Sequence, residues 1–110
     1  MTSHNKSLFR VVFLNQGQIY ELYARELTQN HLYGFVEIGD FVFGERSEVV
    51  VDPSEEKLKS EFENVTRSYI PMHSVVRIDE VKKEGVSKIT KVDDSTSNIT
   101  PFPYIPPANK

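Results

Sequence analysis

Near its start the chain carries the run Leu8-Phe-Arg-Val-Val-Phe-Leu-Asn-Gln-Gly-Gln-Ile-Tyr-Glu-Leu-Tyr-Ala-Arg25. Its first half is rich in β-branched and aromatic residues and is apolar on both faces apart from Arg10, which predicts a central strand over residues 8–14. The second half alternates in polarity and predicts a returning strand over residues 19–25. Gly17 can adopt a positive φ between them, so the run predicts a β-hairpin.

Further short strands are predicted beyond the hairpin. Residues 35–43 form one long strand pattern interrupted at Gly39, where a glycine indicates a bulge or sharp bend. Residues 48–52 predict a short apolar strand, and residues 66–70 predict a strand that Pro71 ends or places at an edge. After a tight turn at residues 72–74, residues 75–81 alternate as a final strand.

One helix is predicted over residues 53–64. Asp52 is in position to cap it, Pro53 occupies the first helical position and Glu55 lies at the third. A single narrow apolar stripe follows at helical spacing, formed by Leu58, Phe62 and Val65. The narrow stripe predicts a helix on the surface of the body, and its acid-rich stretch from Glu55 to Glu63 predicts a solvated face.

The pattern as a whole predicts a mainly β protein with one short helix, an α+β fold. It is compatible with a small curled antiparallel sheet or with a partly open barrel of the SH3 or Sm type. Ten of the 12 aromatic residues lie in the first 81 positions. We therefore expect a flexible N-terminus over residues 1–7, one β-rich domain over 8–83 and a flexible proline-containing tail over 84–110.

Composition limits the classes of function. The chain has no cysteine, which excludes disulfides, thiolate zinc sites and cysteine nucleophiles and suits a reducing compartment. Its first seven residues are polar and no apolar run has the ~18 residues of a membrane span, so we expect a cytoplasmic protein. Residues 1–81 hold 8 basic and 13 acidic residues, a balance of −5 that argues against wholesale nucleic-acid binding.

Several longer stretches resemble a family of short bacterial proteins classed as a domain of unknown function. They are residues 15–25, Val42-Phe-Gly-Glu-Arg-Ser47, residues 51–62 and Tyr69-Ile-Pro-Met-His-Ser-Val-Val-Arg-Ile-Asp-Glu-Val81. The resemblance spans about residues 8–83 and implies a bacterial cytoplasmic protein without implying an activity. Residues 70–78 also look like the end of Sm-like barrels, although the helix departs from the usual Sm-like spacing.

No spacing in the chain indicates catalysis or metal binding. There is no HxH, HExxH or G-x-S-x-G pattern and no glycine-rich phosphate loop. His73 is either a base or phosphate contact or simply a turn histidine bonded to nearby backbone, and His31 is either a ligand contact or a solvated loop residue. We therefore expect no enzymatic activity, no metal and no cofactor.

Two groups of residues remain as candidate binding sites. Arg46, Arg67 and Arg77, with Tyr23, Tyr33 or Tyr69, would form a base-stacking and phosphate-pairing patch, or else pair with the many surface carboxylates; His73 would lie beside such a patch. In the tail, Phe102 and Tyr104 alternate with prolines, which is typical of a docking peptide. That segment would dock on another protein, fold back on the body or remain idle.

The leading hypothesis is thus a non-enzymatic binding or adaptor module that acts through protein contacts. The alternative is a small-barrel regulator associated with RNA.

Overall fold

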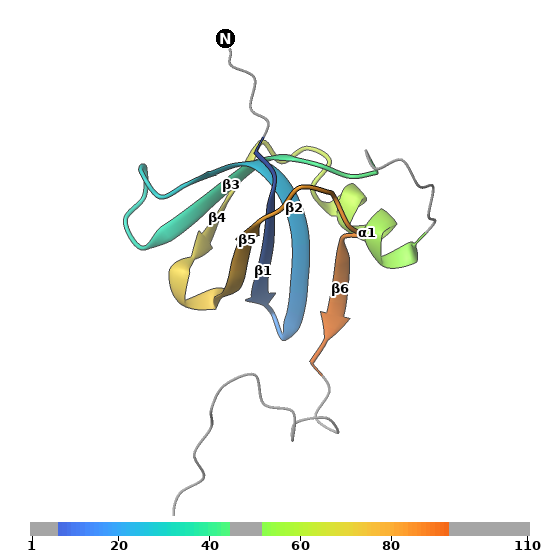
Figure 1. Cartoon of the computed structure of the whole chain (residues 1–110). Coiled ribbons are helices and arrows are strands. Elements are labelled where there is room, and N and C mark those ends of the chain that lie inside the picture. Colours follow the sequence, from blue (N-terminus) through green and yellow to red (C-terminus); the bar gives the residue numbers. More distant parts are fainter. Residues whose placement is uncertain (1–6, 45–51, 93–110) are drawn as a thin grey trace, which may run out of the picture.

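The structure is a computed structural model that describes residues 7–44 and 52–92. Within those residues the chain is mainly β with one α-helix, as the sequence predicts (Figure 1). The elements are β1 (Phe9–Asn15), β2 (Gln18–Thr28), β3 (Phe35–Phe41), α1 (Pro53–Glu61), β4 (Arg67–Pro71), the single-turn 3-10 helix η1 (Met72–Ser74), β5 (Val75–Glu80) and β6 (Lys88–Lys91).

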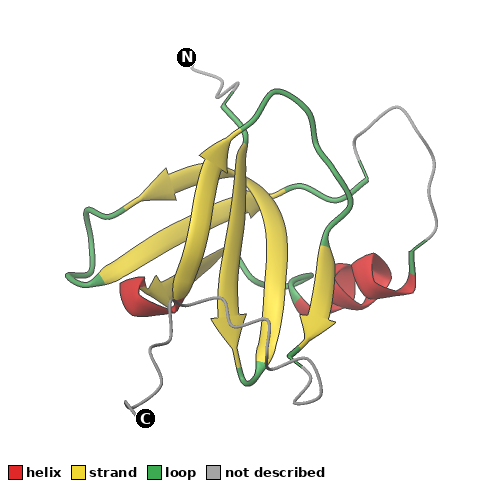
Figure 2. Cartoon of the chain, turned by 60° about the horizontal axis from the view of Figure 1, so that its bottom comes forward, coloured by secondary structure: helices red, strands yellow, loops and turns green. Residues whose placement is uncertain are grey.

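The strands form one curled antiparallel sheet in the order β4-β3-β2-β1-β5, with β6 added alongside β2. The two end strands, β4 and β5, follow one another through η1, yet the pairings found among the described residues do not join them. The sheet therefore curls without closing, which confirms the predicted curled sheet. Figure 2 shows α1 lying to one side, next to β6.

The predicted hairpin is confirmed. Strand β1 pairs with β2 from Phe9 opposite Ala24 to Asn15 opposite Gln18, which leaves a two-residue turn. Both turn residues have positive φ, 53° at Gln16 and 75° at Gly17. This geometry matches the right-handed twist of the flanking strands, and Gly17 adopts it without a Cβ clash.

Strand β2 bends between its two halves and serves two different neighbours on one edge. Residues Gln18–Glu21 pair with β6, whereas residues from Ala24 to Thr28 pair with β3. The other edge of β2 pairs with β1. The first half turns Tyr20, Leu22 and Ala24 into the core. The next core side chain is Leu27, an odd-numbered residue, so the strand face that points inward changes between Ala24 and Leu27.

The main core lies inside the curl and α1 covers one side of it. Leu22, Ile38 and Leu58 are fully buried there. The rings of Phe13 and Tyr20 stack with their centroids 5.2 Å apart. Leu58 and Phe62 of the predicted stripe contact this core, which confirms which face of the helix is apolar.

Helix α1 begins where the sequence predicts. The Asp52 carboxylate accepts hydrogen bonds from the backbone N–H groups of Ser54 at 2.9 Å and Glu55 at 3.2 Å. The helix ends at Glu61, before the predicted residue 64. The acidic face was predicted to be solvated, but Glu55 is buried, and its carboxylate accepts a hydrogen bond from the backbone N–H of Ser87 at 3.1 Å.

Two other expectations change. The bend predicted at Gly39 lies instead at Asp40, whose φ is 53°. Residues 88–91 were placed in the tail, but they form β6, because Ile89 is paired to Tyr20 and its N–H donates to Ser54 Oγ. The domain body therefore extends past residue 83 to Lys91. The predicted strand over 48–52 lies largely outside the described residues.

The cap predicts a measurable stability change. Asp52→Ala removes the acceptor for two orphan N–H groups and should lower the free energy of unfolding by about 0.5–2 kcal/mol. Chemical denaturation of the variant and the wild type measures this difference. Asp52→Asn keeps a capping oxygen and is the control, expected to remain close to wild type; an equal loss in both variants would contradict the cap.

Candidate functional site

A groove lies between α1 and the bend of the sheet. Its volume is about 740 Å³. It runs from the end of β3 along α1 to the start of β4. The lining residues are Glu26, Asp40, Phe41, Phe43, Glu56, Lys59, Ser60, Phe62, Glu63, Val65, Thr66 and Arg67.

Aromatic rings form the apolar part of the groove. The rings of Phe41 and Phe62 lie with centroids 5.0 Å apart, and Phe62 also meets Tyr20 edge-on at 6.5 Å. Phe41, Phe43 and Phe62 all pack against the core while remaining only partly buried. Core packing thus holds three rings in place, and each ring keeps part of its surface accessible from the groove.

The charged residues that line the groove are mostly acidic. Glu26, Asp40, Glu56 and Glu63 contribute four carboxylates, whereas Lys59 and Arg67 contribute two cations. Arg67 is already engaged, because its guanidinium contacts Glu26 at 3.1 Å and Glu37 at 3.5 Å. The lining therefore carries an excess of negative charge, and both Glu56 on α1 and Glu63 in the turn after it are exposed.

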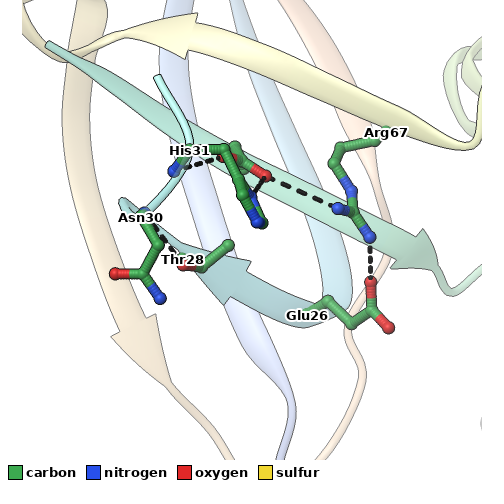
Figure 3. Close-up of polar contacts among 6 residues, drawn as sticks. Glu26, Thr28, Asn30, His31 and Arg67 are labelled. Carbon is green, nitrogen blue, oxygen red and sulfur yellow. Dashed lines mark hydrogen bonds and ion pairs between the residues drawn. The ribbon is translucent and has the colours of Figure 1, made fainter. Parts of the chain in front are cut away.

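A buried carboxylate anchors one end of the groove. Glu37 lies in the middle of β3 on the face away from the main core, and its side chain is 1% exposed. The β2–β3 loop folds over it, so that the His31 backbone N–H donates to it at 3.0 Å and His31 Nδ1 lies 2.8 Å from both carboxylate oxygens. Arg67 reaches the same carboxylate at 3.5 Å and continues to Glu26 at 3.1 Å, and Figure 3 shows the contact between Arg67 and Glu26.

These contacts set the ionisation of Glu37. Burial opposes the charged form and alone would raise its pKa. The hydrogen bonds from His31 and the electrostatic attraction of His31 and Arg67 outweigh burial, so the pKa of Glu37 lies below its ordinary value of 4.5. The carboxylate is therefore held ionised, and its role is to fix the loop and Arg67.

Gly39 leaves the space that this arrangement needs. A Cβ at that position would lie 3.0 Å from the Glu26 carboxylate and 3.1 Å from the Thr66 carbonyl oxygen. Arg67, paired with Gly39 in the β3–β4 ladder, crosses this gap to reach Glu26. The glycine that interrupts the strand pattern therefore permits a close approach between neighbouring strands.

The comparison with protein families gives one match. The family described as "Domain of unknown function (DUF1820)" matches residues 7–104. The chain belongs to the DUF1820 family. This confirms the predicted resemblance to a domain of unknown function and extends it beyond residue 83. No curated protein and no solved structure gave a significant match.

The predicted site residues of this DUF1820 chain do not gather in one place. Arg67 lies in the groove, whereas Arg77 lies on β5, at the far end of the strand order, and pairs with Asp79 at 2.9 Å. His73 is exposed on η1. Tyr23 is buried in a second small cluster with Leu8 and Val42, so it cannot stack on a base. Arg46, Phe102 and Tyr104 lie outside the described residues.

Sequence reasoning did not find the members of the groove other than Arg67. Glu37 carried a signal, since it is a lone carboxylate between apolar residues in a strand that is buried on both faces. His31 was weighed only as a loop contact, and its pairing with Glu37 depends on how the loop folds back.

In residues 7–44 and 52–92 no group of three or more His, Asp or Glu side chains is placed to hold a metal ion. The described residues also contain no helix long and apolar enough to cross a membrane.

The Glu37 contacts predict a dependence of stability on pH. The folded chain holds Glu37 ionised to a lower pH than the unfolded chain does, so the unfolded state binds the proton first. The stabilisation should be complete above the ordinary carboxyl value of 4.5 and should disappear as the pH falls through the lower folded pKa.

Thermal unfolding of the wild type and Glu37→Gln from neutral pH down to about pH 3 tests this expectation. Glu37→Gln should unfold at a clearly lower temperature at neutral pH, and the gap should narrow in acid. Glu26→Gln removes the exposed partner of Arg67 and serves as the control, with a smaller effect. A gap that stays constant with pH would show that Glu37 stabilises the fold without its charge.

Proposed function

We propose that this DUF1820 protein is a non-enzymatic binding module whose groove along α1 takes an apolar peptide segment flanked by basic side chains. The observation that carries the proposal is the combination of three partly exposed phenylalanine rings with an acidic lining. The rings of Phe41, Phe43 and Phe62 supply the apolar contact, and the carboxylates around them select the charge of the partner.

The apolar contact would provide most of the binding energy. A groove of about 740 Å³ lies within the size range of ligand sites and is large enough for more than one side chain. Burial of an aromatic or aliphatic side chain against rings that core packing already holds costs little reorganisation. An aromatic anchor also gains from edge or offset stacking against Phe41 and Phe62.

The acidic lining would supply specificity. Glu56 on α1 and Glu63 in the turn after it are exposed on the helix side of the groove. Glu26 and Asp40 lie at its sheet side. Carboxylates around an apolar centre attract a cationic partner and disfavour an anionic one, and the Phe faces attract cations as well. The overall balance of −5 over residues 1–81 acts in the same direction.

The way the polar groups are used supports a binding role over catalysis. Glu37 is committed to His31 and Arg67, and Arg67 is shared between two carboxylates. A general base or nucleophile needs a free group within reach of a substrate. We also place the protein in the bacterial cytoplasm, a proposal supported by the absence of cysteine.

The second candidate function is RNA association, which the sequence suggested through a patch of arginines. Of the arginines predicted for an RNA patch, Arg67 and Arg77 are paired with carboxylates and lie on strands far apart in the sheet order. Exposed lysines do occur near the end of the described chain, at Lys82, Lys83, Lys88 and Lys91. An RNA role would therefore have to use that region rather than the groove.

Fluorescence anisotropy with three short labelled peptides tests the proposal. One peptide carries phenylalanine between lysines, the second carries it between glutamates, and the third replaces the phenylalanine with alanine. We expect saturable binding of the first peptide alone, weakening as salt is raised, because salt screens the exposed charges. Equal binding of all three peptides, or tighter binding of a labelled single-stranded RNA, would overturn the proposal.

A pair of charge reversals locates the binding surface. Glu63→Lys reverses an exposed groove carboxylate and should weaken binding of the lysine-flanked peptide roughly fivefold or more, the effect of about 1 kcal/mol per exposed charge pair. Glu80→Lys makes the same change at an exposed site on β5, outside the groove. If both variants lose affinity equally, the effect arises from net charge and the groove is not the site.

A further inference from the structure

A second hollow lies at the open end of the curled sheet, on the other side of Phe62 from the groove. Its volume is about 340 Å³. Its lining combines apolar and polar side chains and includes two exposed large ones, Leu14 at 39% and Tyr69 at 45%. The full lining is Phe13, Leu14, Asn15, Glu61, Phe62, Ser68, Tyr69, Ile70, Pro71 and Ser74.

The chain leaves the described body beside this hollow. Lys91, the last residue of β6, pairs with Gln18, and Gln18 pairs on its other side with Asn15, which lines the hollow. The Val92 N–H donates to the Gly17 carbonyl at 3.2 Å. Two strand spacings, about 10 Å in all, therefore separate Val92 from the rim. The end of β6 and the β1–β2 turn lie together at the lower end of Figure 1.

The next residues of the chain contain an apolar segment of suitable chemistry. Pro101-Phe-Pro-Tyr-Ile-Pro-Pro107 places Phe102 and Tyr104 between prolines after a polar stretch. The DUF1820 match extends to residue 104 and so includes both aromatic residues. The nine residues from 93 to 101 can span up to about 30 Å, three times the distance to the rim.

We propose that this hollow is the docking site of the chain's own segment around Phe102 and Tyr104. Of the three alternatives that the sequence leaves open, the position of the hollow favours folding back on the body. One aromatic ring would pack against Leu14 and Tyr69, where edge or offset stacking is available. The Tyr104 hydroxyl can reach the polar rim formed by Asn15, Ser68 and Ser74.

The chain that links β6 to Phe102 allows a weak contact to hold the segment in the hollow. A short linker holds the segment near the hollow at an effective concentration in the millimolar range, so a contact with a millimolar dissociation constant is already half occupied. Prolines on both sides restrict the segment before it docks and reduce the ordering entropy lost on contact. The inference stands apart from the proposed peptide groove, since the two hollows share only Phe62.

Paramagnetic relaxation in the full chain tests the contact. Because the chain has no cysteine, Asn109→Cys creates a single site for a nitroxide label. We expect strong broadening of the backbone amides of Leu14, Tyr69 and Ser74, with little effect on Glu80 at the opposite end of β5. Replacing both Phe102 and Tyr104 with serine in the labelled chain should abolish this pattern.

A matched pair of substitutions on the body completes the test. Leu14→Ser removes an apolar side chain from the hollow, and Leu32→Ser makes the same change on the β2–β3 loop at a similar exposure of 44%. We expect the first to reduce the broadening and the second to preserve it. Broadening centred on the α1 groove, uniform weak broadening, or broadening transferred to an unlabelled copy mixed with labelled chain would each overturn the inference.

Discussion

Strand β2 pairs with three other strands along its two edges, and the rest of the structure depends on how these pairings are divided. Strand β1 occupies one edge from Gln18 to Ala24. The other edge is divided between β6 at its start and β3 at its end. Strand β2 twists and bends as it passes from β6 to β3 (Figure 1), and the side chains that it turns into the core change from Tyr20, Leu22 and Ala24 to Leu27. The curl of the sheet follows from that bend.

The division of β2 also explains where the hollows lie. Ile89 of β6 and Ser87 just before it donate backbone hydrogen bonds to Ser54 and Glu55 at the start of α1, which sets the helix beside the bend. The groove is the space between that helix and the end of β3, and Glu37, held by His31 and Arg67, fixes its far rim. Because β4 and β5 do not pair with each other, the opposite end of the sheet stays open and forms the second hollow.

Much of the local structure was predictable because its causes are local. The β1–β2 turn follows from Gly17, and the start of α1 follows from Asp52 and Pro53, since each depends on the conformation of a few adjacent residues. Strand β6 was not predictable in the same way. Its four residues, Lys88–Lys91, are polar at three positions, and only the free edge of β2 and the contact of Ile89 with α1 make them a strand.

By itself the sequence determined the fold class, the hairpin, the cap and the apolar face of the helix, because periodicity and turn chemistry are written in neighbouring residues. Only the tertiary structure decided which charges meet. Glu37, His31, Glu26 and Arg67 come from three strands and a loop, and a pairing across strands depends on register and on how the loop folds back. For the same reason Arg67 and Arg77 lie at different ends of the sheet, whereas Phe62 joins the distant pair Phe41 and Phe43 in one groove.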